Sequence, residues 1–296
     1  MNPAELPTRP AWFRFEHGGA AHVGAIDPAR SGPGGGPGWF DLGPLDVLRL
    51  LHDGALTRAD LELRIGRSAP IPAPGRFLTP VPRGPKILCL AKNYTAHAKE
   101  MGGAAPAEPI FFAKLPDTLV AHGEAVVIPG WLETRVDHEA ELALVLGFAD
   151  PDGRGRRNVD AADAPALVAG FTPLNDVTAR KLQGQDREQK YPWLRSKSID
   201  TFCPVGPFVV PRDALDGADL AITMRVNGEV RQQARTSAMV FSIGEALAAM
   251  SRVTTLRPGD LIAMGTPEGV GPVRPGDVME VEVEGLGVLR NPVAAG

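Results

Sequence analysis

Cysteine is scarce in this sequence, which has only Cys89 and Cys203 in 296 residues. Two cysteines are too few for a disulfide framework, and both stand among apolar neighbours, in "KILCLA" and "TFCPVG". We therefore expect two reduced side chains buried in a core. Neither cysteine has a general base beside it in the sequence, so the pattern does not favour a thiol nucleophile.

Long apolar runs and an excess of one charge are also lacking. No uninterrupted apolar stretch approaches the roughly 18 to 20 residues that span a bilayer, and the N-terminus shows no basic segment followed by an apolar one. The 31 basic and 35 acidic residues give a net charge of −4, which provides no basic field for nucleic acid or an anionic membrane. We expect a cytoplasmic protein that acts on small molecules, without a nucleic-acid or membrane partner.

Glycine and proline, in contrast, are abundant, with 34 and 29 residues. Such a composition argues against a helix bundle and predicts an α+β, mainly β architecture with many turns. Residues 1–75 are interpreted as a small N-terminal α/β module with a short helix at 44–54. The Pro-rich stretch 67–86 is interpreted as a linker, and residues 76–296 as a catalytic domain.

The segment "DHEAELALVLG" places acids at every second position. On a strand, Asp137, Glu139 and Glu141 would point to one side. Three alternating acids are common on a solvated sheet face, but the same side continues into Ala143 and Val145, which indicates a strand that enters a core. Acids at the mouth of a buried strand need a compensating cation.

A further oxygen ligand is available at the end of the apolar stretch "LVAGFTPLND". Together with Glu139 and Glu141, Asp176 would provide an all-oxygen set that suits Mg²⁺ or Mn²⁺. The usual zinc spacings are absent from the sequence. The residues themselves leave a metal site and a solvated acidic face as alternatives.

Three other residues could take part in chemistry. His97 and Glu100 are three apart in a predicted helix, where they would share a face as either a surface ion pair or an oriented general base. The glycines that follow would let this segment move as a lid. Lys197 is either an ordinary surface lysine or, near a metal, a cation that stabilises an oxyanion.

Beyond these local patterns, residues from about 86 to 293 resemble the fumarylacetoacetate hydrolase family. The matching segments, in family order, are "CLAKNYTAHAKE", "EPIFFAK", "DHEAELALVLG", "NDVTARKLQ", "RSKSIDTFCPVGP", "MVFSIGEAL" and "LRPGDLIAMGTPEGVG". The resemblance implies a mixed β-sandwich roll preceded by a small N-terminal domain. It also implies a divalent metal, a 2-oxo acid substrate and a homodimer.

The resemblance assigns roles to individual residues. The metal ligands fall on Glu139, Glu141 and Asp176, which would bind Mg²⁺ or Mn²⁺ and could accept Ca²⁺ in crystals. The catalytic positions fall on His97, Glu100 and Lys197. Positions that contact the substrate or support its carboxylate fall on Lys114, Arg180, Gln183 and Thr266. Two positions depart from the family pattern, Ala91 where glycine is common and Lys181 where an acid is common.

The activity that the resemblance implies first is metal-dependent hydrolysis of a carbon–carbon bond in acylpyruvate-type 2,4-dioxo acids. His97, oriented by Glu100, would activate water, and the metal and Lys197 would stabilise the departing enolate. Decarboxylation, isomerisation or tautomerisation of related acids, such as oxaloacetate or 2-oxo-hept-ene-dioates, passes through the same enolate and remains an alternative. A protein that binds a metal or a small acid without turnover is a further one.

Overall fold

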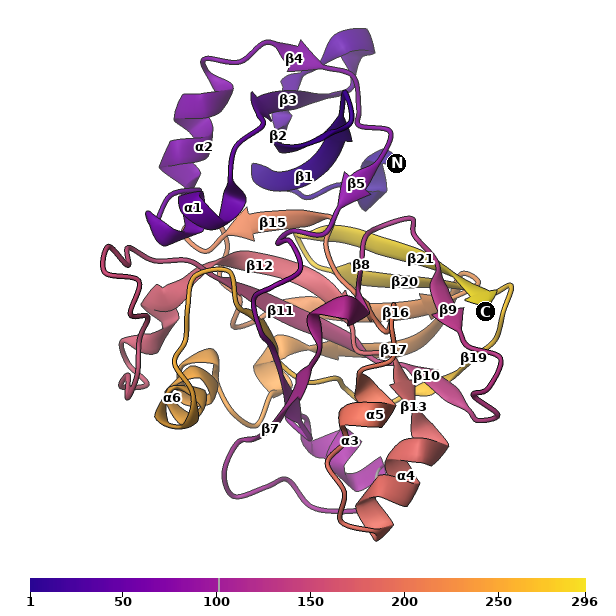
Figure 1. Cartoon of the computed structure of the whole chain (residues 1–296). Coiled ribbons are helices and arrows are strands. Elements are labelled where there is room, and N and C mark those ends of the chain that lie inside the picture. Colours follow the sequence, from indigo (N-terminus) through magenta and orange to yellow (C-terminus); the bar gives the residue numbers. More distant parts are fainter. Residues whose placement is uncertain (101) are drawn as a thin grey trace.

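In the computed structural model, which describes residues 1–100 and 102–296, strands that are distant in sequence join in one large sheet (Figure 1). Its strands are β1 (Ala11–His17), β2 (Ala20–Ser31), β3 (Pro37–Gly43), β4 (Pro70–Ile71), β5 (Phe77–Leu78), β6 (Ile87–Ala91), β7 (Ile110–Lys114), β11 (Ala140–Leu146), β12 (Val168–Asn175), β15 (Phe208–Pro211) and β18 (Leu261–Ala263). They follow the order β4-β3-β2-β1-β15-β12-β11-β18-β6-β7, with β5 paired to β1.

A second sheet packs against the middle of the first. It has the order β17-β16-β20-β21-β9, and its strands are β9 (Val126–Ile128), β16 (Ala221–Val226), β17 (Glu229–Arg235), β20 (Val278–Val283) and β21 (Gly287–Ala295). Strands β11 and β12 lie against β16 and β20. Short pairings complete the β structure, in β8 (Leu119–Val120) with β14 (Cys203–Pro204), and in β10 (Val136–His138) with β13 (Thr178–Ala179) and β19 (Gly271–Val273). The expected α+β, mainly β fold is confirmed.

Strand β11 is covered on both faces, and every residue in it is buried. Leu142 and Leu144 belong to the core between the two sheets. Ala143 and Val145 point the other way and share a second apolar cluster with Leu51. Because successive side chains alternate between faces, a strand covered on both sides must be apolar throughout. This explains the uninterrupted apolar run that follows the acids.

Helices flank the sheets and lie mostly at their edges (Figure 1). They are α1 (Val47–His52), α2 (Arg58–Ile65), α3 (Thr95–Glu100), α4 (Arg180–Glu188), α5 (Leu194–Lys197) and α6 (Ile243–Val253), and 3-10 turns occur at Pro3–Glu5, Pro33–Gly35, Pro116–Thr118, Ala164–Leu167 and Thr236–Ala238. A capping box of Ser242 and Glu245 starts α6. The first helix was expected to begin at Pro44, but it begins at Val47, because the Asp46 side chain accepts the hydrogen bonds of the first free N–H groups.

The N-terminal strands extend the main sheet and are not a separate layer. Strand β1 pairs with β15 through Trp12 opposite Val209 and Phe13 opposite Phe208. The stretch 67–86, interpreted as a linker, also contributes the short strands β4 and β5 to this sheet. A division of the chain between residues 75 and 76 stays a prediction.

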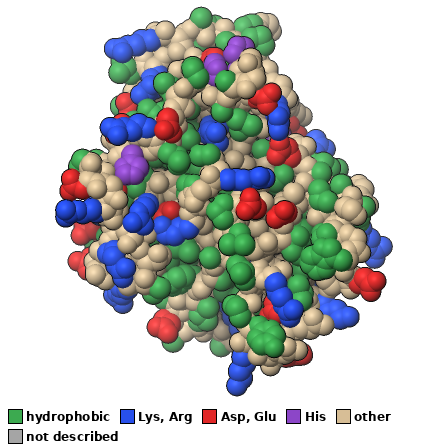
Figure 2. Space-filling view, viewed as in Figure 1, with side chains coloured by type: hydrophobic (Ala, Val, Ile, Leu, Met, Phe, Trp, Pro, Cys, Tyr) green, Lys and Arg blue, Asp and Glu red, His purple; other side chains and the backbone are tan. Residues whose placement is uncertain are grey.

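Other features agree with the composition. Cys89 and Cys203 are buried and free, and burial raises the pKa of the Cys203 thiol to about 12. The face in Figure 2 carries basic and acidic side chains interspersed among apolar ones. Within residues 1–100 and 102–296, no helix is long and apolar enough to cross a membrane.

Phe13 should be a main contributor to the attachment of the N-terminal strands. Its ring lies 5.5 Å from Trp39, 5.6 Å from Phe77 and 6.0 Å from Phe208 between centroids. We predict that Phe13→Ala lowers the free energy of unfolding by about 3–5 kcal/mol, because it leaves a cavity among these rings. Denaturant unfolding measures this loss. Leu63→Ala is the control, since Leu63 is 53% exposed, and an equal loss in both variants would contradict the prediction.

Candidate metal centre

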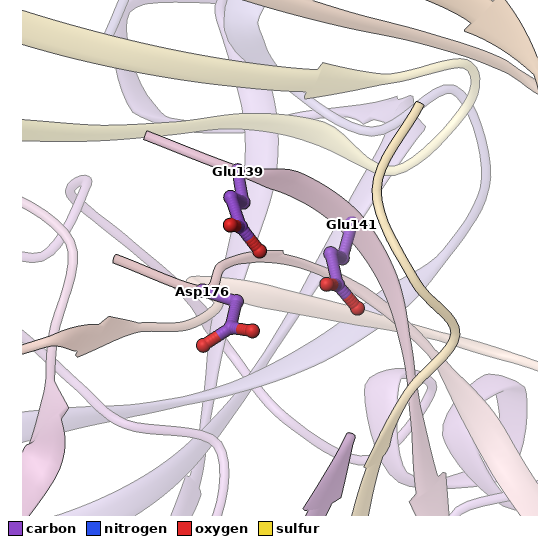
Figure 3. A group of neighbouring side chains, drawn as sticks. All are labelled: Glu139, Glu141 and Asp176. Carbon is purple, nitrogen blue, oxygen red and sulfur yellow. The ribbon is translucent and has the colours of Figure 1, made fainter. Parts of the chain in front are cut away.

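Three buried carboxylates meet at the end of β11. Glu139, Glu141 and Asp176 each offer an oxygen, and these oxygens all lie within 4.8 Å of one another. Figure 3 shows the three side chains pointing toward a common space. The backbone holds them together, because the N–H of Asp176 donates to the carbonyl of Glu139 at 2.9 Å. The structure thus brings together the three acids that the sequence analysis selected as metal ligands.

Asp137, the first acid of the alternating pattern, lies apart from this group. The sequence pattern predicted one strand across 137–147, but the ladder breaks at Glu139, and β10 and β11 belong to different sheets. At the break, the N–H of Glu139 donates to Asn175 Oδ1 at 2.9 Å and not to a neighbouring strand. The Asp137 carboxylate instead accepts from Arg135 at 2.5 Å and from Arg180 at 2.8 Å.

Three cations surround the acids. Lys197 Nζ donates to Glu139 Oε2 at 2.9 Å and to Asp176 Oδ2 at 2.5 Å. Lys114 Nζ donates to Asp176 Oδ1 at 2.7 Å, and the Arg180 guanidinium pairs with Glu139. Lys197 is buried, so it is not the surface lysine that its local sequence allowed. The two acids that accept from Lys197 are therefore compensated by nearby positive charge, as buried charges must be.

The surroundings shift the pKa values of Glu139 and Glu141 in opposite directions. Burial alone would raise the pKa of Glu139, but Lys197 and Arg180 hold that pKa well below its usual range. Burial and the negative charges of Asp176 and Glu139 raise the pKa of Glu141. Glu141 accepts the N–H of Gly265 at 2.6 Å and pairs with no cation among the described residues. A divalent cation would supply the charge that this carboxylate lacks, and an all-oxygen donor set suits a hard ion.

A histidine–carboxylate pair lies on α3 beside the acids. His97 Nδ1 and Glu100 Oε2 are 3.0 Å apart, and the His97 side chain is 8% exposed. Because a carboxylate only accepts, Nδ1 carries the hydrogen, and in the neutral ring Nε2 keeps a free lone pair. Glu100 also accepts the N–H of Gly269 at 3.1 Å, which ties α3 to the loop after β18. Met101, which lies between this helix and the glycines that follow it in the sequence, is outside the described residues.

These groups line one cavity of about 430 Å³. Phe112 and Trp193, which the sequence analysis did not select, form an aromatic wall with centroids 5.7 Å apart. The other lining residues are Leu90, Ala91, Lys92, His97, Ile110, Glu139, Glu141, Asp176, Arg180, Gln183, Gly184, Arg187, Lys197 and Thr266. A larger hollow of about 960 Å³ lies between α6 and residues 212–218, but no titratable group of the candidate centre lines it.

The expected substrate-contacting residues do not all reach this cavity. Arg180, Gln183 and Thr266 line it, and Gln183 Oε1 accepts from Arg180 at 2.6 Å. Lys114 does not belong to the lining. It is buried behind Asp176, where it also donates to the carbonyl of Val177 at 3.3 Å. The structure therefore gives Lys114 the place of a support for Asp176.

Comparison with known proteins agrees with the family resemblance of the sequence. Residues 86–294 match the sequence profile described as fumarylacetoacetate (FAA) hydrolase C-terminal. An uncharacterized protein of Pyrococcus abyssi is 48% identical over 72% of this chain and 92% of its own length. The mitochondrial oxaloacetate tautomerase FAHD2A of Bos taurus is 37% identical over 95% of this chain and 90% of its own length.

Solved structures are similar over nearly the whole chain. A fumarylacetoacetate hydrolase from Exiguobacterium antarcticum superposes with a TM-score of 0.80 at 33% identity, covering 97% of this chain and 100% of its own. A 5-carboxymethyl-2-hydroxymuconate delta-isomerase from Mycobacterium smegmatis gives 0.71 at 34% identity, covering 97% and 99%. The fumarylpyruvate hydrolase from Pseudomonas aeruginosa, in complex with Mn²⁺ and pyruvate, gives 0.66 at 33% identity, covering 76% and 94%.

Because Glu139 has cationic partners and Glu141 has none, we predict that replacing each by glutamine has opposite effects on the free energy of unfolding of the metal-free protein. Glu139→Gln should lower the free energy of unfolding by about 3 kcal/mol, because it removes a partner of buried Lys197. Glu141→Gln should raise it by about 1 kcal/mol near neutral pH, because it removes a repelled buried charge.

The pH dependence follows from the sign of the shift. Since the folded-state pKa of Glu141 is raised, the contribution of Glu141 to stability is greatest below the ordinary value of 4.5 and is lost as pH rises through the shifted pKa. Glu141→Gln should flatten this fall. Denaturant unfolding in a chelator measures both variants, and effects of the same sign would contradict the charge assignment.

Proposed function

This chain belongs to the fumarylacetoacetate hydrolase family, and we propose that it is a divalent-metal-dependent hydrolase that cleaves a carbon–carbon bond in acylpyruvate-type 2,4-dioxo acids. The observation that carries the proposal is the meeting of three groups in one cavity: the acids at the end of β11, the His97–Glu100 pair and buried Lys197. The similar hydrolase with Mn²⁺ and pyruvate supports a metal and a 2-oxo acid as occupants.

Glu139, Glu141 and Asp176 would hold the ion. Their oxygen donors favour Mg²⁺ or Mn²⁺ over softer metals. When bound, the ion supplies positive charge that lowers the energy of an enolate in the cavity. Its charge would also offset the repulsion that raises the pKa of Glu141.

His97 and Lys197 would carry out proton transfer and charge stabilisation. Nε2 of His97 takes a proton from water, and the water oxygen attacks the carbonyl carbon two positions beyond the keto group. The bond between the attacked carbonyl carbon and the carbon next to the keto group breaks, and its electrons form the enolate of a 2-oxo acid. Lys197 places its ammonium next to the negative charge, and the proton on His97 returns to the enolate carbon. Phe112 and Trp193 reduce access of further water on one side.

Tautomerisation of a 2-oxo acid is the second candidate. It is favoured by the identity of 37% to an oxaloacetate tautomerase over 95% of this chain, which exceeds that to each similar hydrolase structure named above. In this reaction Nε2 of His97 would move a proton between the carbon next to the keto group and its oxygen. No water is consumed, and the carbon skeleton stays intact.

A substrate panel separates the two candidates. With Mn²⁺ present, we predict that an acylpyruvate is consumed and that one pyruvate is released per molecule. A coupled enzymatic reduction of pyruvate measures this release. A tautomerase would instead accelerate interconversion of enol and keto oxaloacetate, seen in the ultraviolet, and would release no pyruvate from the acylpyruvate. That second pattern would contradict hydrolysis as the main activity.

His97→Ala tests the proposed base. It should reduce turnover of an acylpyruvate at least about 100-fold, because the proton acceptor is lost. It should keep the thermal stabilisation by Mn²⁺, whereas Glu139→Gln should lose it. Lys99→Ala is the matched control on the same helix, since Lys99 is exposed. Turnover in His97→Ala equal to that in Lys99→Ala would refute the role of His97.

A further inference from the structure

Gln232 is a buried polar side chain in β17, a strand in which most other residues are exposed. It is 1% exposed, whereas Val230 on the same strand is 53% exposed. The register of β17 against β16 shifts between Val230 and Gln232, so that Arg231 is the extra residue of a bulge. A bulge redirects the side chain beside it. Core packing does not explain why the apolar Val230 is exposed while the polar Gln232 is buried, so the burial of Gln232 needs another explanation.

All four hydrogen-bonding positions of the Gln232 amide are used. Oε1 accepts from the N–H of Ala140 at 3.0 Å and from His138 Nδ1 at 3.2 Å. Nε2 donates to Thr266 Oγ1 and to the carbonyl of Pro267, both at 2.8 Å. The N–H of Ala140 can only donate and the carbonyl of Pro267 can only accept, so these contacts fix which end of the amide is which.

This orientation determines the direction of the Thr266 hydroxyl. Since Nε2 is a donor, Thr266 Oγ1 must accept from it, and the hydroxyl hydrogen is left for another acceptor. Among residues 1–100 and 102–296, no protein acceptor takes that hydrogen. Thr266 is 4% exposed and lines the cavity that holds Glu139, Glu141 and Asp176. A buried hydroxyl whose hydrogen has no acceptor in the protein can donate it to an oxygen of a ligand in the cavity.

The loop that carries Thr266 is fixed against the bulge. Gly269 has φ +90°, and a Cβ at this position would lie 2.3 Å from the carbonyl oxygen of Arg231. Only glycine permits this approach without displacement of the loop. The Glu100 carboxylate holds the same loop from the other side through the N–H of Gly269. Thr266 is therefore placed by rigid contacts on both sides.

We propose that Gln232 is a positioning residue that keeps Thr266 Oγ1 as an acceptor, so that the Thr266 hydroxyl donates its hydrogen to a carboxylate or keto oxygen of the bound 2-oxo acid. This inference rests on the proposed function, because it needs an oxo acid in the cavity. Gln232 touches no substrate itself. Its effect passes through the hydroxyl of Thr266.

Calorimetric titration of Mn²⁺-loaded protein with pyruvate tests the proposal. In Gln232→Glu the side chain has two acceptors, so the Thr266 hydroxyl donates to it and is lost to the ligand. Pyruvate affinity should fall at least about tenfold in this variant and in Thr266→Val. The double variant should bind pyruvate no more weakly than Thr266→Val alone, since both substitutions remove the same contact. Gln233→Glu adds the same charge at an exposed neighbour and should bind pyruvate within about twofold of wild type.

Two results would overturn the proposal. If Gln232→Glu weakens pyruvate binding by the same factor with and without the Thr266 hydroxyl, it acts through charge or structure alone. If Thr266→Val binds pyruvate as tightly as wild type, the hydroxyl makes no contact. The second test holds even where Gln232→Glu does not fold, and Thr266→Ser, which keeps the hydroxyl, should retain affinity. Absence of pyruvate binding by the Mn²⁺-loaded wild type would instead refute the proposed function, and this inference with it.

Discussion

The arrangement of the whole site depends on the compensation of buried negative charge. Three carboxylates, each less than 5% exposed, share one space, and such a group is stable only if positive charge is close. Lys197 and Arg180 provide it for Glu139, and Lys114 and Lys197 provide it for Asp176. Glu141 has a backbone N–H as its partner and no cation. A bound cation would complete this balance, and the missing charge distinguishes the group from a closed ion-pair network.

The fold supplies rigid positions for these charges. Glu141 belongs to β11, in the middle of the main sheet, and Asp176 directly follows its neighbour β12. Both strands pack against the second sheet, and this close packing opposes separation of the carboxylates. The loop after β18 adds Thr266 on one side, and α3 is tied to that same loop through Glu100. The carboxylates, the His97–Glu100 pair and the Thr266 hydroxyl are thus fixed relative to one another.

Local sequence patterns predicted what depends on neighbouring residues. The alternation of acids before an apolar run identified Glu139 and Glu141 as candidate ligands. The break of the ladder at Glu139 was not predictable, because it arises from Asn175, 36 residues away. The local sequence left Lys197 open between a surface position and a place near a metal for the same reason, since its partners are 21 and 58 residues away. Gln232 gave no local signal, because its role depends on loops that the topology brings together.

Anomalous diffraction from crystals soaked in Mn²⁺ is the most direct test of the central claim. It locates the ion without reference to activity. The charge balance predicts one anomalous peak among Glu139, Glu141 and Asp176, with an oxygen of each carboxylate in its coordination shell. A well-ordered structure at high Mn²⁺ concentration in which no peak lies there would contradict the account.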